Sequence, residues 1–456
     1  MVLDLKGKKV LVLGLGESGV STAKFLKDEG VKVIVNDYKE EEYFKNLINY
    51  FKENDISYIF GGHPTEILND VDLIVISPGI PKTNPIYIEA KRRGIKVISE
   101  IELAYWYSEV PIIAVTGTKG KSTTTTLIGE ILKNANIPNI VAGNIGLPFV
   151  SVVKNLKEGY FVLEVSSFQL EDVEEFRPFI SLFINIYPDH LDRYSNMNEY
   201  ILAKARIFMN QKKEDYAILN HDQKEIVNLA KPYEVRKLFF GFDKHEEEGL
   251  FYEEDKSEIF YNFSDRKGFL SIPKGIWNRI LVNNFMASAL VGLLLGVREE
   301  VIEKTGEEFQ GIPFALQKIG EINGRIFVND SKATNPISTI SAIRSITSPI
   351  LLILGGRNKN FDFQELFENI KKSTVKVLIL IGETKEVMKN LSEEYDIPYV
   401  LADSLESAVK KAYEMSQPGD VILLSPACAS FDMFRNYKER GKVFNEVFER
   451  LKYEKI

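Results

Sequence analysis

The stretch TGTKGKSTTTT (residues 116–126) lies between the apolar run PIIAV (residues 111–115) and the apolar-periodic segment LIGEILKNANI (residues 127–137). This order predicts a strand, a glycine-rich turn and a helix. Backbone amides converge in such a turn, and the helix dipole adds partial positive charge, so the turn can hold a polyphosphate. Lys121 would then reach the terminal phosphates, and Ser122 would hold Mg²⁺.

The glycine spacing of this loop differs from that of the common phosphate-binding loop. The common motif has a glycine at the place of Val115, whereas the first glycine here is Gly117. The strand, the Gly-Lys-Ser sequence and the helix are all kept. Their combination favours a functional phosphate site over a chance occurrence of three residues.

The composition is that of an ordinary globular protein, with 45% hydrophobic and 27% charged residues among 456. A net charge of −8 argues against broad nucleic-acid binding, and the single cysteine, Cys428, excludes an intramolecular disulfide. No apolar run is long enough for a membrane span, and no signal-peptide pattern precedes the first predicted strand. We therefore expect a cytoplasmic protein that binds small molecules.

Strand, turn and helix patterns alternate along most of the chain, which predicts an α/β fold with parallel sheets covered by helices. We expect a Rossmann-like domain over residues 1–99, a central P-loop ATPase-type domain over residues 100–311, and a second Rossmann-like domain over residues 312–456. Within the central domain, the runs FFGFD, GLFYEED, EIFYNFSD and GFLSIP predict a small section of short antiparallel strands.

Two polar residues in apolar surroundings are candidate metal ligands. Glu164 interrupts YFVLEVSSFQL (residues 160–170), and a buried carboxylate needs a cation partner such as Mg²⁺ beside the phosphate loop. His190 ends the apolar run of FINIYPDHLDRY (residues 183–194), together with Asp189 and Asp192. The carboxyl end of a strand is where α/β sheets place ligands, which favours a ligand role for His190.

A second glycine-rich turn, GLGESG (residues 14–19), follows the strand pattern KKVLVLG near the start of the chain. Gly14, Gly16 and Gly19, with Asp37 at the end of the next predicted strand, form the dinucleotide-binding fingerprint. By itself this fingerprint suggests NAD, and a dehydrogenase is an alternative. A simple dehydrogenase, however, needs neither a phosphate loop nor a metal site in the next domain.

Seven segments together resemble the motifs of the Mur ligases, in the same order along the chain. They are TGTKGKST, GNIGLP, LEVSSFQLE, DHLDRY, NDSKATNP, LGGRNK and LLSPACASFD. The resemblance covers essentially the whole chain, and the pair NDSKATN and SPACASFD points to the members of the family that add D-glutamate.

The resemblance implies a three-domain ligase with two small-molecule substrates, which we expect to act as a monomer. ATP would phosphorylate the carboxylate of UDP-N-acetylmuramoyl-L-alanine, and the amine of D-glutamate would attack the acyl phosphate to form an amide in peptidoglycan precursor synthesis. The fold of the first domain would then hold UDP instead of NAD. No nucleophile from the protein is required.

The resemblance also implies roles for individual residues. Lys204 matches a lysine that is carbamylated in the family, and Asn284 matches an asparagine that reads adenine. The expected catalytic residues are Lys121, His190, Lys204 and Lys332; the ATP-binding residues are Gly117, Thr118, Lys119, Gly120, Lys121, Ser122, Thr123, Asn284 and Asp330. The expected metal ligands are Ser122, Glu164, His190 and carbamylated Lys204. UDP-substrate residues are Glu17, Ser18, Asp37, Tyr38, Gly79, Asn144 and His190, and D-glutamate residues are Thr334, Lys359, Ser430, Phe431 and Tyr437.

The chain departs from the family pattern just inside the third domain. The usual His-Arg-x-Glu is replaced by Phe314, Ala315, Leu316 and Gln317, and the missing arginine would contact the nucleotide phosphates. The usual His-Asn near Trp277 is also absent. The alternatives are therefore a catalytically weakened or silent Mur ligase paralogue, or another P-loop NTPase.

Overall fold

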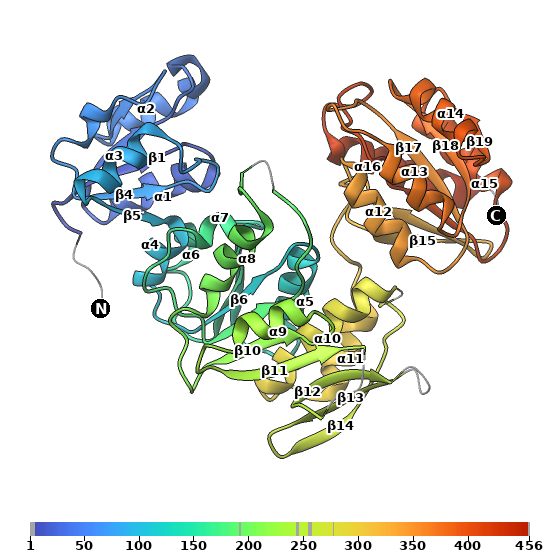
Figure 1. Cartoon of the computed structure of the whole chain (residues 1–456), viewed down its shortest axis with the longest axis horizontal. Coiled ribbons are helices and arrows are strands. Elements are labelled where there is room, and N and C mark those ends of the chain that lie inside the picture. Colours follow the sequence, from blue (N-terminus) through green and yellow to red (C-terminus); the bar gives the residue numbers. More distant parts are fainter. Residues whose placement is uncertain (1–4, 191–192, 243–245, 254–257, 277, 455–456) are drawn as a thin grey trace. The chain divides into compact units, whose positions relative to one another are not determined.

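The computed structural model describes residues 5–190, 193–242, 246–253, 258–276 and 278–454. Asp192 and Trp277 lie outside the described residues. The chain divides into two compact units: unit 1 comprises Met1–Pro273 and Asn283–Glu307, and unit 2 comprises Lys274–Val282 and Glu308–Ile456. Figure 1 shows the helices and strands of both units.

The N-terminal part of unit 1 contains a parallel sheet with the strand order β3-β2-β1-β4-β5. Alternate residues of β1 pack into two hydrophobic cores, one on each face of the sheet. Leu11 and Leu13 face one side, and Val10 and Val12 face the other. Glycine-rich residues 14–16 therefore follow a strand that is buried on both faces. The strands are β1 (Lys9–Leu13), β2 (Lys32–Asn36), β3 (Ser57–Ile59), β4 (Leu73–Ile76) and β5 (Lys96–Ser99), and the helices are α1 (Glu17–Asp28), η1 (Glu41–Phe44), α2 (Lys45–Glu53), η2 (Thr65–Leu68), α3 (Pro85–Arg93) and α4 (Glu100–Trp106).

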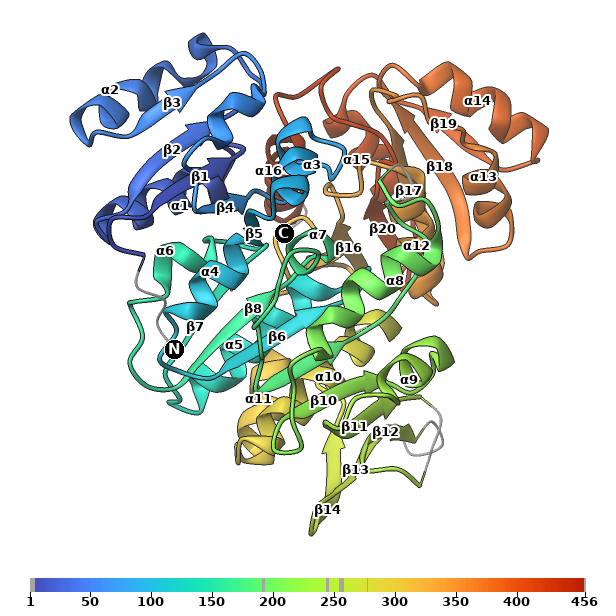
Figure 2. The same cartoon turned by 60° about the vertical axis from the view of Figure 1, so that its left-hand side comes forward.

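The central sheet of unit 1 has the order β14-β13-β12-β11-β10-β9-β6-β8-β7. Strand β6, which leads into the phosphate loop, lies between β8 and β9 and is parallel to both. Figure 2 shows β6 next to β8. The strands are β6 (Ile112–Thr116), β7 (Asn139–Gly143), β8 (Tyr160–Glu164), β9 (Ile180–Phe183), β10 (Tyr216–Asn220), β11 (Arg236–Gly241), β12 (Gly249–Glu253), β13 (Glu258–Phe263) and β14 (Arg266–Ser271). The helices are α5 (Lys121–Asn134), α6 (Phe149–Val152), α7 (Ser167–Leu170), α8 (Met197–Ala205), η3 (Arg206–Phe208), α9 (Lys224–Ala230), α10 (Arg279–Leu294) and α11 (Glu299–Glu308).

The antiparallel section is smaller than the sequence predicted. The FFGFD strand, β11, is parallel to β10, and β12 is parallel to β11. Among the described residues of the central sheet, antiparallel pairing is limited to β12, β13 and β14. The prediction was wrong for β11 because helix α9 connects it to β10, and a strand that follows such a crossover returns parallel to the first.

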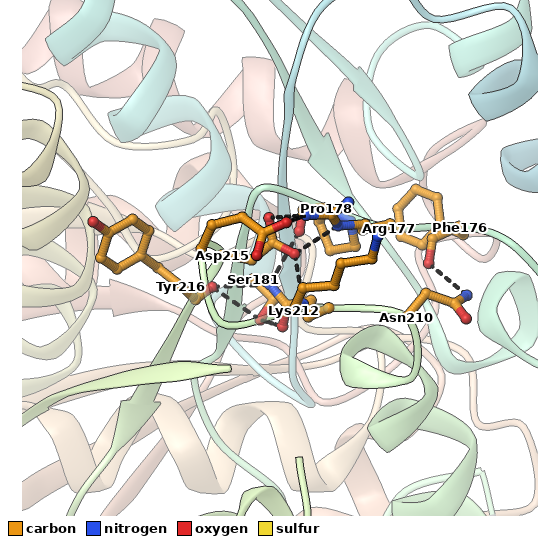
Figure 3. A network of polar contacts seen from close by, with 10 residues as sticks. Phe176, Arg177, Pro178, Ser181, Asn210, Lys212, Asp215 and Tyr216 are labelled. Atoms are coloured by element: carbon orange, nitrogen blue, oxygen red, sulfur yellow. Dashed lines mark hydrogen bonds and ion pairs between the residues drawn. The ribbon is translucent and has the colours of Figure 1, made fainter. Parts of the chain in front are cut away.

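A polar network fixes the starts of β9 and β10, the strands next to β6 on one side (Figure 3). Arg177 donates to both carboxylate oxygens of Asp215, at 2.7 and 3.1 Å. Asp215 also accepts the backbone N–H of Lys212, and Asn210 donates to the carbonyl of Phe176. These contacts tie the segments that precede β9 and β10 to each other.

One hydrophobic core continues through unit 1 from the N-terminal sheet to the central sheet. It includes Val12 of β1, Leu103 of α4, Phe149 of α6 and Phe161 of β8. Helices α1, α4 and α6 contact one another. The core therefore runs past residues 99 and 100, where the sequence suggested a domain boundary, and that boundary stays a prediction.

Unit 2 contains a sheet with the order β15-β16-β20-β17-β18-β19, parallel except for β15. Leu352 and Leu354 of β17 face one core and Leu351 and Ile353 the other, so helices cover both faces. The strands are β15 (Gln317–Ile322), β16 (Arg325–Asn329), β17 (Ile350–Gly355), β18 (Val375–Ile381), β19 (Tyr399–Leu401) and β20 (Val421–Leu424), and the helices are α12 (Pro336–Ser345), α13 (Gln364–Lys371), α14 (Lys385–Glu394), α15 (Leu405–Met415) and α16 (Tyr437–Glu454).

The predicted α/β class, with three sheets and a small antiparallel section, is confirmed. Within the described residues, no helix is both long and apolar enough to cross a membrane.

Candidate active site

The phosphate loop follows β6 at the carboxyl edge of the central sheet. Two glycines in it have positive φ, 152° at Gly117 and 80° at Gly120. A Cβ atom on Gly117 would lie 2.6 Å from Ile184 Cγ1, so only glycine fits there. Gly120 caps helix α5 without any side-chain hydrogen bond, which leaves the helix N-terminus, with its positive dipole end, as an anion site.

Asn185, just past β9, holds the phosphate loop in shape. Its Oδ1 accepts the backbone N–H groups of Thr118 and Lys119 at 3.0 and 2.8 Å, and its Nδ2 donates to the Lys119 carbonyl at 2.7 Å. The side chain is buried. Lys121 lies over this turn and donates to the Thr118 carbonyl at 3.0 Å. The loop conformation is therefore set by a residue that the sequence did not single out.

Glu164, the last residue of β8, lies beside the first turn of α5. Ser122 Oγ donates to Glu164 Oε2 at 2.6 Å, and Asn144 Nδ2 donates to Oε1 at 2.7 Å. The carboxylate is almost fully buried, at 3% exposure. Residues predicted from separate motifs thus meet here, and Asn144 contacts the metal candidate Glu164.

Mg²⁺ fits this donor set. A serine hydroxyl and a buried carboxylate are hard oxygen donors, and Mg²⁺ commonly takes one or two protein ligands while keeping several waters. Among the described residues, no group of three or more His, Cys, Asp and Glu side chains lies close enough to hold a metal ion. An ion at Ser122 and Glu164 would therefore need further ligand atoms besides these two side chains, such as oxygen atoms of water or substrate.

Lys204 of α8 is a buried lysine next to the phosphate loop. Its Nζ donates to the Gly117 carbonyl at 2.8 Å, and the side chain is 2% exposed. Burial lowers the pKa of Lys204 well below its usual value, and the charge of Lys121 lowers it further. Tyr200, one helical turn earlier, shares a 3.1 Å hydrogen bond with the Thr118 hydroxyl, and burial raises its pKa to about 12.

His190 lies in a turn beyond β9 and has a left-handed backbone conformation, with φ at 56°. Its ring packs edge-on to Phe168, with centroids 4.8 Å apart, and lies 6.0 Å from the ring of Tyr200. The nearest approach of its Nε2 to Asp189 is 3.9 Å. The structure thus places the predicted histidine close to the Tyr200 that borders the phosphate loop.

The N-terminal sheet collects its predicted substrate residues at one edge. The Asp37 carboxylate accepts the backbone N–H of Leu15 at 2.8 Å and that of Lys39 at 3.0 Å, so it shapes the glycine-rich turn directly. Tyr38 is 62% exposed, and Glu17 begins α1. The Ser18 hydroxyl is buried and has no hydrogen-bond partner among the described residues.

Asn284 of α10 lies against Gly120 of the phosphate loop. A Cβ atom on Gly120 would lie 2.6 Å from Asn284 Oδ1, so the amide packs against the glycine. Its Nδ2 is buried and has no hydrogen-bond partner within the described residues. A buried donor of this kind is available to a ligand.

In unit 2, Asp330 binds residues 314–317, the segment that departs from the family pattern. Its Oδ1 accepts the backbone N–H of Leu316 at 3.0 Å, and its Oδ2 accepts the Ser425 hydroxyl at 2.7 Å. The backbone N–H of Lys332 donates to the Phe314 carbonyl, and the Phe314 ring occupies the space that a side chain on Gly441 would need. The departure is thus accommodated by specific packing.

Arg440 joins NDSKATNP and SPACASFD, two of the segments that carry predicted D-glutamate residues. It is 1% exposed and donates to Ser331 Oγ, the Ser331 carbonyl and the Cys428 carbonyl, at 3.0, 2.8 and 3.1 Å. Near it, Ser430 is buried, whereas Phe431 is 55% exposed. The centroid of the Phe431 ring lies 5.9 Å from Lys359 Nζ. Thr334 is half-buried, and Tyr437 begins α16.

Asn185 and Arg440 are two residues of these sites that were not predicted from the sequence. Asn185 stands in the FINIYPDHLDRY run, and Arg440 lies eight residues after SPACASFD. Their position inside or close to recognised motifs was the available signal.

Comparison with known families identifies the chain's class. Residues 8–99 match the Mur ligase MurD-like N-terminal domain, residues 115–292 the Mur ligase middle domain, and residues 316–428 the Mur ligase glutamate ligase domain. The chain belongs to the Mur ligase family, as its motifs predicted.

Curated relatives match over nearly the full length. A protein of Clostridioides difficile (strain 630) named UDP-N-acetylmuramoylalanine--D-glutamate ligase is 41% identical over 460 residues, covering 99% of this chain and 100% of the relative. A protein of the same name from Thermoanaerobacter pseudethanolicus (strain ATCC 33223 / 39E) is 41% identical over 454 residues, with the same coverage.

Solved structures share the fold. The MurF ligase from Thermotoga maritima in complex with ADP has a TM-score of 0.59 and 16% identity, with 100% of both chains covered. A pseudomurein peptide ligase type C from Methanothermus fervidus has a TM-score of 0.56 and 18% identity, with 98% of this chain and 100% of the other covered.

Proposed function

We propose that this protein is an ATP-dependent amide ligase that joins D-glutamate to UDP-N-acetylmuramoyl-L-alanine in peptidoglycan precursor synthesis. The observation that carries the proposal is the 2.6 Å hydrogen bond between Ser122 and Glu164. It brings a hydroxyl and a buried carboxylate to the first turn of the helix that would receive the ATP phosphates. The names of relatives 41% identical over nearly the whole chain support the choice of substrates.

In the proposed reaction, a carboxylate oxygen of the UDP-substrate attacks the γ-phosphorus of ATP and ADP leaves. The amine of D-glutamate then attacks the acyl carbon, phosphate leaves, and one proton is released as the amide forms. Because no protein nucleophile takes part, catalysis rests on positioning and on stabilising negative charge as it moves between oxygen atoms. Lys121, which lies over the loop, would pair with the terminal phosphates.

Ser122 and Glu164 would hold Mg²⁺, which when bound neutralises phosphate charge. We propose that His190 and the carbamate of modified Lys204 are further ligands of this ion. The neutral amine of Lys204 would add CO₂, forming a carbamate and releasing a proton. Two observations support this modification: the lysine is almost fully buried, and its lowered pKa favours the neutral amine that reacts with CO₂.

The remaining predicted roles concern binding of the two nucleotide substrates. We propose that Glu17, Ser18, Asp37, Tyr38 and Gly79 line the UDP site and that Asn284 contacts adenine. The N-terminal sheet, central sheet and unit 2 would correspond to the three domains predicted from the sequence. We also propose that the protein acts as a monomer in the cytoplasm.

A catalytically weakened paralogue is the second candidate, and one observation favours it. Phe314 and Leu316 are fixed on unit 2 by Gly441, Lys332 and Asp330, in the segment where the family has an arginine. This packing provides no cation for the nucleotide phosphates at position 315.

Phosphate release distinguishes the candidates. Purified protein would be given ATP, Mg²⁺ and UDP-N-acetylmuramoyl-L-alanine, with D-glutamate, L-glutamate, glycine or D-alanine as the amine. The ligase predicts release that requires both the UDP-substrate and D-glutamate. Release without them would indicate another NTPase, and nucleotide binding without release would indicate the weakened paralogue.

A further inference from the structure

Arg193 connects the His190 turn to the N-terminal sheet within unit 1. Its backbone N–H donates to the His190 carbonyl at 3.0 Å, so the two residues share one turn. Its guanidinium donates from Nη1 to the Pro78 carbonyl at 2.8 Å and from Nη2 to the Ile80 carbonyl at 3.1 Å. These two carbonyls flank Gly79, a residue proposed to line the UDP site.

The turn at residues 77–80 is packed directly against the first glycine-rich turn. Ser77 Oγ donates to the Gly14 carbonyl at 2.7 Å, and the Ile80 backbone N–H donates to the Ser77 carbonyl at 3.0 Å. A Cβ atom on Gly14 would lie 2.8 Å from Ile80 Cγ1. A shift of this turn would therefore move the edge at which the UDP-substrate is proposed to bind.

The guanidinium of Arg193 is held on its other sides as well. It lies over the Phe168 ring, 4.1 Å from the centroid, and donates to Glu171 Oε2 at 3.1 Å. Phe168 also packs against the His190 ring. The Arg193 side chain is 17% exposed and that of Glu171 only 5%. A planar guanidinium can reach a carboxylate and two carbonyls with donors on separate nitrogen atoms in a fixed geometry, whereas the three donors of a lysine all lie on one nitrogen.

We propose that Arg193 is a positioning residue that sets the UDP-binding turn at residues 77–80 in place relative to the His190 turn. The inference rests on the proposed function, because it assumes a UDP-substrate that spans both turns. Arg193 would act through the carbonyls of Pro78 and Ile80 and would not touch the reacting atoms.

The test measures binding of UDP-N-acetylmuramoyl-L-alanine to the full-length protein without ATP, by titration calorimetry, together with steady-state kinetics. We expect Arg193→Ala to raise the Kd and the KM for the UDP-substrate about tenfold, the size of effect that loss of charge-assisted hydrogen bonds produces. The KM for ATP should stay within about twofold, because the hydrogen bonds, ion pair and ring contact of Arg193 among the described residues do not involve the phosphate loop.

Three further variants separate the carbonyl contacts from charge and from folding. Lys91→Ala removes a cation 3.9 Å from Asp172 and serves as the matched control. The Kd and the KM for the UDP-substrate should not change in this variant. Glu171→Gln keeps both carbonyl contacts and should bind the UDP-substrate like the wild type. Arg193→Lys keeps a charge beside Glu171 and should still show most of the loss, which also covers the case in which Arg193→Ala does not fold.

Unchanged UDP-substrate binding in both Arg193 variants, or an equal loss in Glu171→Gln, would overturn the inference while leaving the proposed function intact. Wild-type UDP-substrate binding in Arg193→Lys would assign the effect to charge alone and would also overturn the inference. A wild-type protein that does not bind the UDP-substrate at all would overturn the proposed function and the inference together.

Discussion

Lys204 donates from Nζ to the carbonyl oxygen of Gly117 at 2.8 Å and so joins helix α8 to the first glycine of the phosphate loop. The lysine is almost fully buried, and its pKa is lowered mainly by burial and then by the nearby charge of Lys121. A lysine in this environment is costly in its charged form and chemically useful in its neutral form.

The first prediction concerns stability and pH. Because the pKa of Lys204 is lower in the folded state, the unfolded state binds more protons between that pKa and the ordinary value of about 10.4. The free energy of unfolding should therefore rise with pH across this window. In CO₂-depleted buffer, Lys204→Met should raise the Tm relative to the wild type by an amount that shrinks as the pH approaches about 10.

Thermal unfolding from about pH 7 to about pH 10 checks this, with Lys133→Met as the control. Lys133 lies in the last turn of α5, and its side chain is 72% exposed. A Tm difference for Lys204→Met that did not depend on pH would contradict the account.

The second prediction concerns the proposed carbamate. Lys204→Ala should be largely inactive, because the site loses the group that would turn a cation into an oxygen ligand. A small carboxylate such as acetate should restore part of the activity by entering the vacated space. Phosphate release measured over a range of acetate concentrations checks this, and full activity of the variant without acetate would rule out a role for the modification.

The third prediction concerns Lys121. Lys121→Ala should lower turnover by about 100-fold or more, because the moving negative charge loses a preorganised cation. Lys133→Ala, which removes an exposed lysine from the same helix, should be near normal. Wild-type turnover in Lys121→Ala would show that the loop is not the phosphate site.

The fourth prediction concerns Asn185. Asn185→Ala removes three hydrogen bonds to the loop, so we expect the KM for ATP to rise at least about tenfold while the KM for the UDP-substrate changes little. Asn228→Ala, at an exposed position of α9, is the control. An unchanged KM for ATP would mean that the loop keeps its shape without the asparagine.

The sequence predicted the structural features of the candidate site that are local in the chain. The strand, glycine-rich turn and helix of the phosphate loop are encoded in about twenty consecutive residues, and the glycines at 117 and 120 have the close contacts that such a turn requires. Glu164 was recognisable because a single carboxylate interrupts an apolar strand, and it is indeed buried.

The contacts that the sequence missed join distant parts of the chain. Asn185 reaches Thr118 across 67 positions, and Arg193 reaches Pro78 across 115. Only the pairing of β6 with β9 and the packing of the two sheets in unit 1 bring these residues together. The parallel direction of β11 was missed for the same reason, since strand direction depends on the connection through α9 and not on the strand's own pattern.

The most direct test of the central claim is the incorporation of labelled D-glutamate into UDP-N-acetylmuramoyl-L-alanine, measured alongside phosphate release from ATP in the presence of Mg²⁺. The account predicts one D-glutamate incorporated for each phosphate released, and little incorporation of L-glutamate. Phosphate release without incorporation, or incorporation that does not depend on ATP, would contradict it.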